Sequence, residues 1–304
     1  MADIKQGAAP APAAAQAPAR KRLPKKLVIM VAAALMLGVF TIVDTSQVGW
    51  ASAQTVGLGA LSILLLAGFV VRQLTASSPL LPLRVFRPRN VWGANLVQLF
   101  MVAGLLGFFF MNSLYMQRVL GLNPLQIGFA FLPVAVTIGV LSVGLSARLT
   151  TRFGARRVLL PGLILVTTGL ALYTRLPVRS NYLVDLLPGM FLLGVGAGLV
   201  FPSLATLAMS SATESDSGLA SGLLNTTAQV GGALGLAVLA TLAASQTQSL
   251  LALGESAPDA LTGGFRMVFG ISAALLVAAF VIAVIVLRHQ PADAGVTERA
   301  EDAA

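Results

Sequence analysis

Eight long apolar runs alternate with short polar segments along the chain of 304 residues, and no run contains Asp, Glu, Lys, Arg or His. A helix that crosses a bilayer needs roughly 20 predominantly apolar residues, with about 17 as the lower limit. The pattern therefore predicts an all-α, polytopic membrane protein with eight transmembrane helices. These helices are predicted over residues 27–43, 55–71, 92–117, 125–147, 158–174, 186–209, 217–245 and 267–287.

The composition supports this fold class. Charged residues make up 10% of the chain, against roughly 25% in an average soluble domain. Placing one Lys, Arg or Asp at the centre of a membrane helix costs about 2.5 to 3.5 kcal/mol, so eight runs without charge indicate insertion. A soluble helical bundle is disfavoured because soluble helices keep one polar face.

The basic residues predict the orientation. If the eight runs cross the bilayer in turn, sixteen of the twenty Lys and Arg residues fall on one side, and only Arg118, Arg175, Arg179 and Arg266 on the other. Lys and Arg are enriched in cytoplasmic loops. We therefore predict a multi-pass protein of the cell inner (plasma) membrane with both termini in the cytoplasm. The loop at 210–216 is acidic, but acidic residues contribute little to orientation.

The runs also divide the chain into segments. The prediction is a disordered, basic cytoplasmic tail at 1–26, a helix pair at 27–72, a cytoplasmic linker at 73–91, a six-helix unit at 92–288 and a disordered cytoplasmic tail at 289–304. An alternative for the first run is a secretory signal cleaved after Ala51-Ser52-Ala53. A retained helix is favoured because the run of 27–43 is longer than the roughly 7 to 15 residues of a signal core.

Several function classes are disfavoured by what the chain contains. A net charge of +9 and a pI near 11 suggest nucleic-acid binding in a soluble protein, but here the basic residues flank membrane runs and face anionic lipid. The chain has no cysteine, and its one histidine, His289, lies beyond the last run. We predict no metal site, no cofactor and no enzymatic activity, and the lipid bilayer rather than nucleic acid as a partner.

Four sequence motifs carry a family resemblance. They are PLLPLRVFR at 79–87, SLYMQRVLGLNPLQIGFAFLP at 113–133, RFGARR at 152–157 and SGLASGLLNTTAQVGGALGLAV at 217–238. Together they resemble the carboxy-terminal part of major facilitator superfamily transporters, above all the fourteen-span drug:proton antiporter branch of multidrug efflux proteins. The resemblance covers about residues 20 to 290 and corresponds to the last eight of fourteen spans, so that 92–288 would form the carboxy-terminal half of the fold.

The resemblance implies export of drugs or other small amphiphilic molecules, with proton antiport expected for the full-length family. Transporters of this kind bind substrate near the bilayer midplane between two halves, so this chain is expected to be a truncated or half transporter. Its partners would be a small-molecule substrate and a missing amino-terminal six-helix half or a second copy. In the resembled family the coupling acids lie in that other half, so the chain alone is not expected to couple export to protons. The alternative is a non-transporting fragment or assembly partner.

The loop at 147–157 resembles a degenerate copy of the family's cytoplasmic-loop motif. Gly154, Leu149, Arg152 and Arg156 match it, whereas Thr151 replaces its Asp. Gly154 suits a tight turn, and guanidinium groups can bond helix ends or carboxylates. The arginines either enforce topology alone or also act in the conformational change. The residues of this loop motif are Arg148, Arg152, Gly154, Arg156 and Arg157.

Small and polar residues recur on one face of the 217–245 run at helical spacing. Small residues let membrane helices approach closely and amides bond across helices, so this face either packs on another helix or lines a substrate cavity. The predicted packing residues are Gly218, Gly222, Gly231, Gly232 and Gly235, and the cavity candidates are Asn225 and Gln229. The same two interpretations hold for the polar residues of the 92–117 run, Asn95, Gln98, Asn112, Tyr115 and Gln117.

Overall fold

The described residues of the computed structural model are 25–48, 52–75, 88–210 and 217–288. Within them the chain is helical apart from short turns. The helices in chain order are α1 (Lys25–Val48), α2 (Ala53–Thr75), α3 (Arg89–Arg118), α4 (Pro124–Val140), α5 (Ala147–Phe153), α6 (Ala155–Tyr173), α7 (Leu187–Met209), α8 (Ser217–Ala252) and α9 (Ala257–Val286). A π-helical segment, Leu141–Ser146, joins α4 to α5, and another, Tyr182–Leu186, leads into α7.

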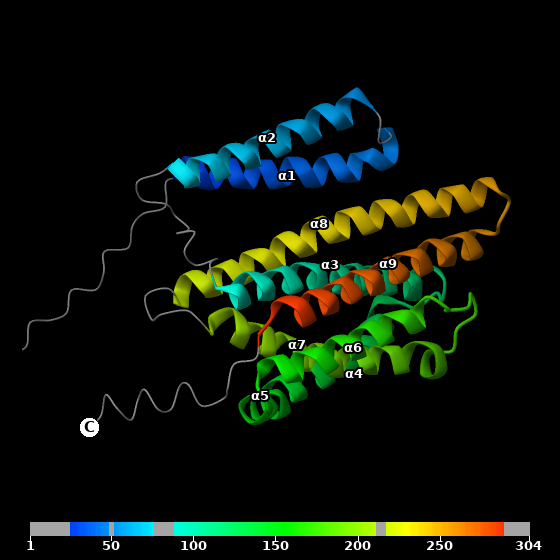
Figure 1. Cartoon of the computed structure of the whole chain (residues 1–304). Helices are drawn as coiled ribbons and strands as arrows, with labels where there is room; N and C mark the ends of the chain where they lie inside the picture. Colours follow the sequence, from blue (N-terminus) through cyan, green and yellow to red (C-terminus); the bar gives the residue numbers. More distant parts are fainter. Residues whose placement is uncertain (1–24, 49–51, 76–87, 211–216, 289–304) are drawn as a thin grey trace, which may run out of the picture.

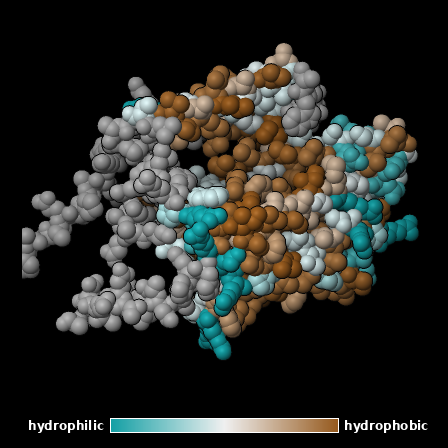
Figure 2. All heavy atoms as spheres, viewed as in Figure 1, coloured by the Kyte–Doolittle hydropathy of each residue, from teal (hydrophilic) through white to brown (hydrophobic). Residues whose placement is uncertain are grey.

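These helices confirm the predicted all-α, polytopic membrane fold. Seven helical rods are long and apolar enough to cross a membrane, where a rod is a helix together with any π-helical segment or helix that continues it without a break. α1 adds a shorter apolar stretch, Ala32–Asp44. Figure 2 shows an apolar band between two hydrophilic margins. Residues 1–24 of the predicted tail at 1–26, the predicted tail at 289–304, the motif at 79–87 and the acidic residues of 211–216 lie outside the described residues. Lys25 and Lys26, predicted as the end of the first tail, instead begin α1.

The last six membrane rods form two groups of three. α3 packs along both α8 and α9, and α7 packs along both α6 and α4. The groups meet where α3 contacts α7 and where α6 contacts α9. Figure 1 shows α3, α8 and α9 side by side, with α4, α6 and α7 beneath them in this view and the α1–α2 pair on the far side of α8.

Glycines bring α6 and α7 into backbone contact. A Cβ built at Gly196 of α7 would lie 2.6 Å from the Gly162 carbonyl oxygen, and one at Gly169 of α6 would lie 2.8 Å from the Gly189 carbonyl oxygen. Carbon atoms in ordinary contact are about 3.5 to 4.0 Å apart. Only a residue without a side chain fits at these positions, so glycine spacing on both helices fixes how closely they pack.

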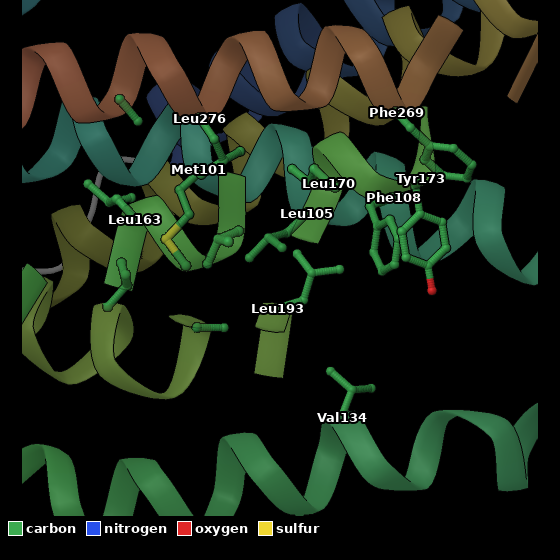
Figure 3. Close-up of a cluster of buried hydrophobic side chains, with 14 of the residues drawn as sticks. Met101, Leu105, Phe108, Val134, Leu163, Leu170, Tyr173, Leu193, Phe269 and Leu276 are labelled. Atoms are coloured by element: carbon green, nitrogen blue, oxygen red, sulfur yellow. The ribbon is translucent and has the colours of Figure 1, made fainter. Parts of the chain in front are cut away.

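An aromatic cluster joins the two groups of helices. The ring of Phe108 on α3 lies edge-on to Tyr173 on α6 with centroids 4.8 Å apart, and Phe269 on α9 lies 5.2 Å from Tyr173. All three side chains are fully buried, and Figure 3 shows them converging beside Leu170 and Leu105. Edge-to-face aromatic pairs at this spacing stabilise a protein beyond the effect of the area they bury. This cluster therefore stabilises the contact between the two groups of three helices.

The α1–α2 pair is attached to the outside of this unit. Ser62 Oγ donates to the Ala34 carbonyl oxygen at 2.8 Å and thereby joins α2 to α1. Thr241 Oγ1 of α8 donates to the Ile42 carbonyl oxygen of α1 at 3.1 Å. The apolar surface of α2 is otherwise exposed, with Ile63 and Leu64 about two-thirds accessible. The pair is therefore held to the bundle mainly through α1 and α8.

Candidate functional site

The seven predicted cavity residues do not converge on one site. Asn95, Gln98, Asn112 and Tyr115 are buried in α3, whereas Gln117 at the end of α3 and both α8 candidates are exposed. The buried candidates can therefore bond only to other parts of the bundle, whereas the exposed candidates face its surroundings.

Asn95 joins α3 to α8. Its Nδ2 donates to the Val91 carbonyl oxygen of its own helix at 2.8 Å, and its Oδ1 accepts from Thr227 Oγ1 of α8 at 3.0 Å. An amide buried in this way is satisfied within the bundle, which is the packing arrangement expected of polar groups between membrane helices.

Tyr115 holds the loop between α6 and the segment leading to α7. Its hydroxyl donates to the Pro177 carbonyl oxygen at 2.6 Å and lies 2.5 Å from Ser180 Oγ. Arg266 of α9 reinforces the same loop, because its Nε donates to the Leu176 carbonyl oxygen at 2.6 Å. Tyr115 therefore anchors this loop to α3.

Asn112 is the unusual member of the set. It is fully buried, and neither amide atom makes a hydrogen bond of normal geometry. The Tyr173 hydroxyl, which donates to the Leu186 carbonyl oxygen at 2.9 Å, is the nearest polar side-chain group and could still accept from the Asn112 amide. A buried polar group left unpaired costs about 1–3 kcal/mol. Gln98 resembles Asn112, since its buried Oε1 also has no partner. A buried polar group without a hydrogen-bond partner lowers the stability of the fold, and such groups are often found at functional sites.

The small polar face of α8 is divided between two environments. Gly231, Gly232 and Gly235 lie against α3, where a Cβ at Gly235 would be 2.5 Å from Ala103 Cβ and 2.6 Å from Ala103 Cα. A Cβ at Gly218 or Gly222, nearer the start of α8, would meet no atom of the chain within 4 Å.

Asn225 and Gln229 lie on the uncovered side of α8. Each is two residues from Thr227, so at 100° per residue both point about 160° away from the side on which Thr227 contacts α3. Both are exposed, as are Gly218, Ser221 and Gly222. We call this set, Gly218, Ser221, Gly222, Asn225 and Gln229, the open face of α8. It contains two amides that hydrocarbon cannot satisfy.

The loop motif forms a rigid turn at one end of the bundle. Gly154 is buried and has φ of 84°, a backbone conformation that favours glycine, and it separates α5 from α6. Arg156 Nη2 donates to the Val284 carbonyl oxygen in the last turn of α9 at 2.8 Å. Thr151, which stands where the motif has Asp, donates to the Ala147 and Arg148 carbonyl oxygens of its own helix. Arg148, Arg152 and Arg157 are exposed.

The end of α9 is also held by α3, which sequence reasoning missed. The Arg288 backbone N–H donates to Asn90 Oδ1 at 2.9 Å, and Arg89 Nη2 approaches the Ile285 carbonyl oxygen at 3.5 Å. Carbonyls in the last turn of a helix lack partners within that helix. Arg89 and Asn90, just before the 92–117 run, were the available signal, but only the folded chain brings them to α9.

A groove of about 280 Å³ opens between α3, α8 and α9, near the end of the bundle that holds the α8–α9 connection. Apolar side chains such as Phe110, Leu114 and Phe265 form most of its wall, and Arg118, Thr247 and Gln248 supply polar groups. None of the seven predicted cavity residues lines it. The groove combines residues from three helices that are far apart in the sequence, so no continuous motif could have indicated it.

The fold and these sites define a polytopic membrane protein with a bipartite six-helix unit and a preceding helix pair. Comparison with known families assigns residues 26–236 to the model of the Major Facilitator Superfamily. The chain belongs to this family of membrane transporters, which confirms the resemblance and the prediction that it is not an enzyme.

The relatives of known function are resistance and export proteins. The chain is 33% identical to puromycin resistance protein pur8 of Streptomyces alboniger, over 82% of the chain and 51% of the relative. It is 35% identical to cephamycin export protein CmcT of Amycolatopsis lactamdurans, over 80% and 51%. The tetracenomycin C resistance and export protein of Streptomyces glaucescens is 30% identical, over 79% and 44%. The chain thus spans about half the length of the curated relatives it matches.

Proposed function

We propose that this chain contributes the eight carboxy-terminal helices of a multidrug exporter and that a second six-helix unit completes the transport site. The names of three relatives, which export or confer resistance to puromycin, cephamycin and tetracenomycin C, support export of amphiphilic small molecules. The matched length, about half of each relative, supports the need for a second unit.

The open face of α8 is the observation that carries this proposal. Unpaired amides at Asn225 and Gln229 are costly against lipid tails, because hydrocarbon offers no hydrogen-bond partner. Gly218 and Gly222 beside them leave room for another backbone to approach. This combination suits a protein surface or a water-filled cavity, which a second unit would supply.

The groove between α3, α8 and α9 suits the proposed substrates. Its apolar walls can bury a hydrophobic ring system, and Arg118 and Gln248 offer hydrogen-bond donors at one end. Small-molecule sites are usually apolar clefts with a few convergent polar groups. A groove of this kind would select by size and amphiphilic character.

Proton coupling would depend on the second unit. Carboxylates of the described residues lie near helix ends or in a turn, namely Asp44, Asp185, Glu255 and Asp259. Proton relays in membranes normally use embedded carboxylates or histidines. We therefore expect antiport only from the complete assembly, and no efflux driven by a pH gradient from the reconstituted chain alone.

We also propose residence in the plasma membrane with the α5–α6 turn and both termini on the cytoplasmic side. The distribution of Lys and Arg supports this orientation. Because the chain contains no cysteine, single-cysteine variants have no background. An impermeant maleimide added to intact cells should label Arg179→Cys and spare Thr151→Cys, and the opposite pattern would reverse the proposed orientation.

The export function is tested in a drug-sensitive bacterium. The chain is expressed alone and together with the six amino-terminal helices of the puromycin relative, and resistance to puromycin and other amphiphilic drugs is measured. Restored resistance in the pair, lost on replacing Asn225 and Gln229 by Leu, supports the proposal. A stable pair without resistance would favour the alternative, a non-transporting assembly partner.

A further inference from the structure

The α5–α6 turn presents three exposed arginines at the edge of the apolar band. Arg148 and Arg152 are four residues apart on α5, which places their Cβ atoms about 5–6 Å apart on one face, and Arg157 follows the turn at Gly154. Figure 1 shows α5 at one end of the bundle. Two guanidinium groups at this spacing can bind the oxygens of a single phosphate.

The turn is held in place independently of any ligand. Gly154 sets its backbone, and Arg156 bonds the Val284 carbonyl oxygen of α9 at 2.8 Å. The Arg152 guanidinium carbon lies 5.3 Å from the centroid of the Phe153 ring, within the range of a cation–π contact. The exposed guanidinium groups are therefore presented by a fixed scaffold, which lowers the entropic cost of binding.

No described carboxylate lies at this end of the bundle. The four described acidic residues, Asp44, Asp185, Glu255 and Asp259, all lie at the opposite end, near the α1–α2, α6–α7 and α8–α9 connections. Among the described residues, the arginines of the turn thus face no acidic partner. Their positive charge suits an anionic ligand.

The surface next to the turn is apolar. Val136, Val140 and Leu145 lie on the same rod, toward the membrane centre from Arg148, and their side chains are 58%, 65% and 47% exposed. Lipid tails tolerate such a surface, in contrast to the open face of α8 with its amides. A headgroup site therefore adjoins a surface suited to an acyl chain.

From these observations we infer that the α5–α6 turn is a binding site for an anionic phospholipid. Arg148 and Arg152 bind the phosphate of the headgroup, Arg157 adds positive charge, and an acyl chain lies along Val140 and Val136. The ligand class is a phospholipid with net negative charge, such as phosphatidylglycerol. The inference does not depend on the proposed export function.

The test measures lipid binding to the purified full chain in detergent micelles by native mass spectrometry, with phosphatidylglycerol and phosphatidylcholine in separate titrations. Phosphatidylglycerol should bind more tightly. The double variant Arg148→Gln, Arg152→Gln should bind it about 30-fold more weakly, equivalent to about 1 kcal/mol for each arginine near an anionic surface. The matched control, Arg72→Gln with Arg288→Gln, removes two exposed arginines from the same end and should lose much less.

Four results would overturn the inference. Equal losses in the two double variants would mean a diffuse charge effect, and equal binding of both lipids would mean no headgroup selection. If millimolar inorganic phosphate competed as effectively as the lipid does, the site would be one for free anions.

If the Gln pair does not fold, the pair Arg148→Lys and Arg152→Lys keeps the charge and should still weaken binding, because an ammonium group cannot form the bidentate contact. Unchanged binding in the Lys pair would also contradict the proposed geometry.

Discussion

Substitution of two glycines of α8 by alanine should have opposite effects on stability. Gly235 packs against α3, and a Cβ there would lie 2.5 Å from Ala103 Cβ and 2.6 Å from Ala103 Cα. Gly222, thirteen residues earlier on the same helix, has nothing within 4 Å of the same position. The pair provides a test and its control in one helix.

The size of the effect follows from these distances. Ordinary carbon contacts are about 3.5–4.0 Å, so Gly235→Ala must move α8 away from Ala103 by about 1 Å or deform the backbone. Overpacking of this kind costs about 1–3 kcal/mol. Alanine is favoured over glycine in a helix interior by roughly 0.5–1 kcal/mol. Because both variants gain this preference, the difference between them measures the steric overlap with Ala103, and we expect about 1–3 kcal/mol.

The free energy of unfolding can be measured in mixed micelles of a mild detergent and dodecyl sulfate. Trp92 lies on α3, so in a background with Trp50→Phe its fluorescence reports on the helix that Gly235 contacts. Gly222→Ala should be as stable as the parent or more stable, and Gly235→Ala less stable. A difference between the variants within about 0.5 kcal/mol, the usual effect of a surface change, would refute the α3–α8 packing described above. Adding Ala103→Gly to Gly235→Ala should restore part of the loss, since it removes the overlap with the Ala103 side chain but leaves the α3 backbone close to the new methyl group.

Three further substitutions test the site. Gly154→Ala should lower the free energy of unfolding by about 1–3 kcal/mol, because φ of 84° strains any other residue, whereas Gly144→Ala, at an open position of the same rod, should not. Asn112→Leu should raise stability by about 1–3 kcal/mol by removing an unpaired buried amide, and a destabilised Leu variant would show that the amide is satisfied. Arg156→Gln should cost about 0.5–1.5 kcal/mol through loss of the bond to Val284, with Arg157→Gln as the exposed control; equal effects of the two would contradict the contact.

Local composition was enough to predict the rods and the turn between α5 and α6. The runs at 92–117 and 158–174 correspond to α3 and α6 within a few residues, because the cost of inserting a segment is close to a sum over its own side chains. Gly154 was predicted as the turn residue because glycine suits a tight turn in a short loop, and it has a positive φ of 84°.

The environment of each polar residue could not be predicted in the same way. Helical spacing put Gly222 and Gly232 on one strip, yet the two positions are still about 80° apart around α8 at 100° per residue. Only Gly232 meets α3. Asn95 and Asn112 share a helix, and a hydroxyl from α8 satisfies one of them while the other stays unpaired.

The sequence by itself thus determined that this chain crosses a membrane, where its helices lie and to which transporter family it belongs. Only the tertiary structure decided which glycines pack, which amides are satisfied, how Arg156 reaches α9 and where a groove opens. The physical reason is that insertion depends on each segment's own residues, whereas packing and hydrogen bonding depend on neighbours that the chain brings together from up to 199 residues away.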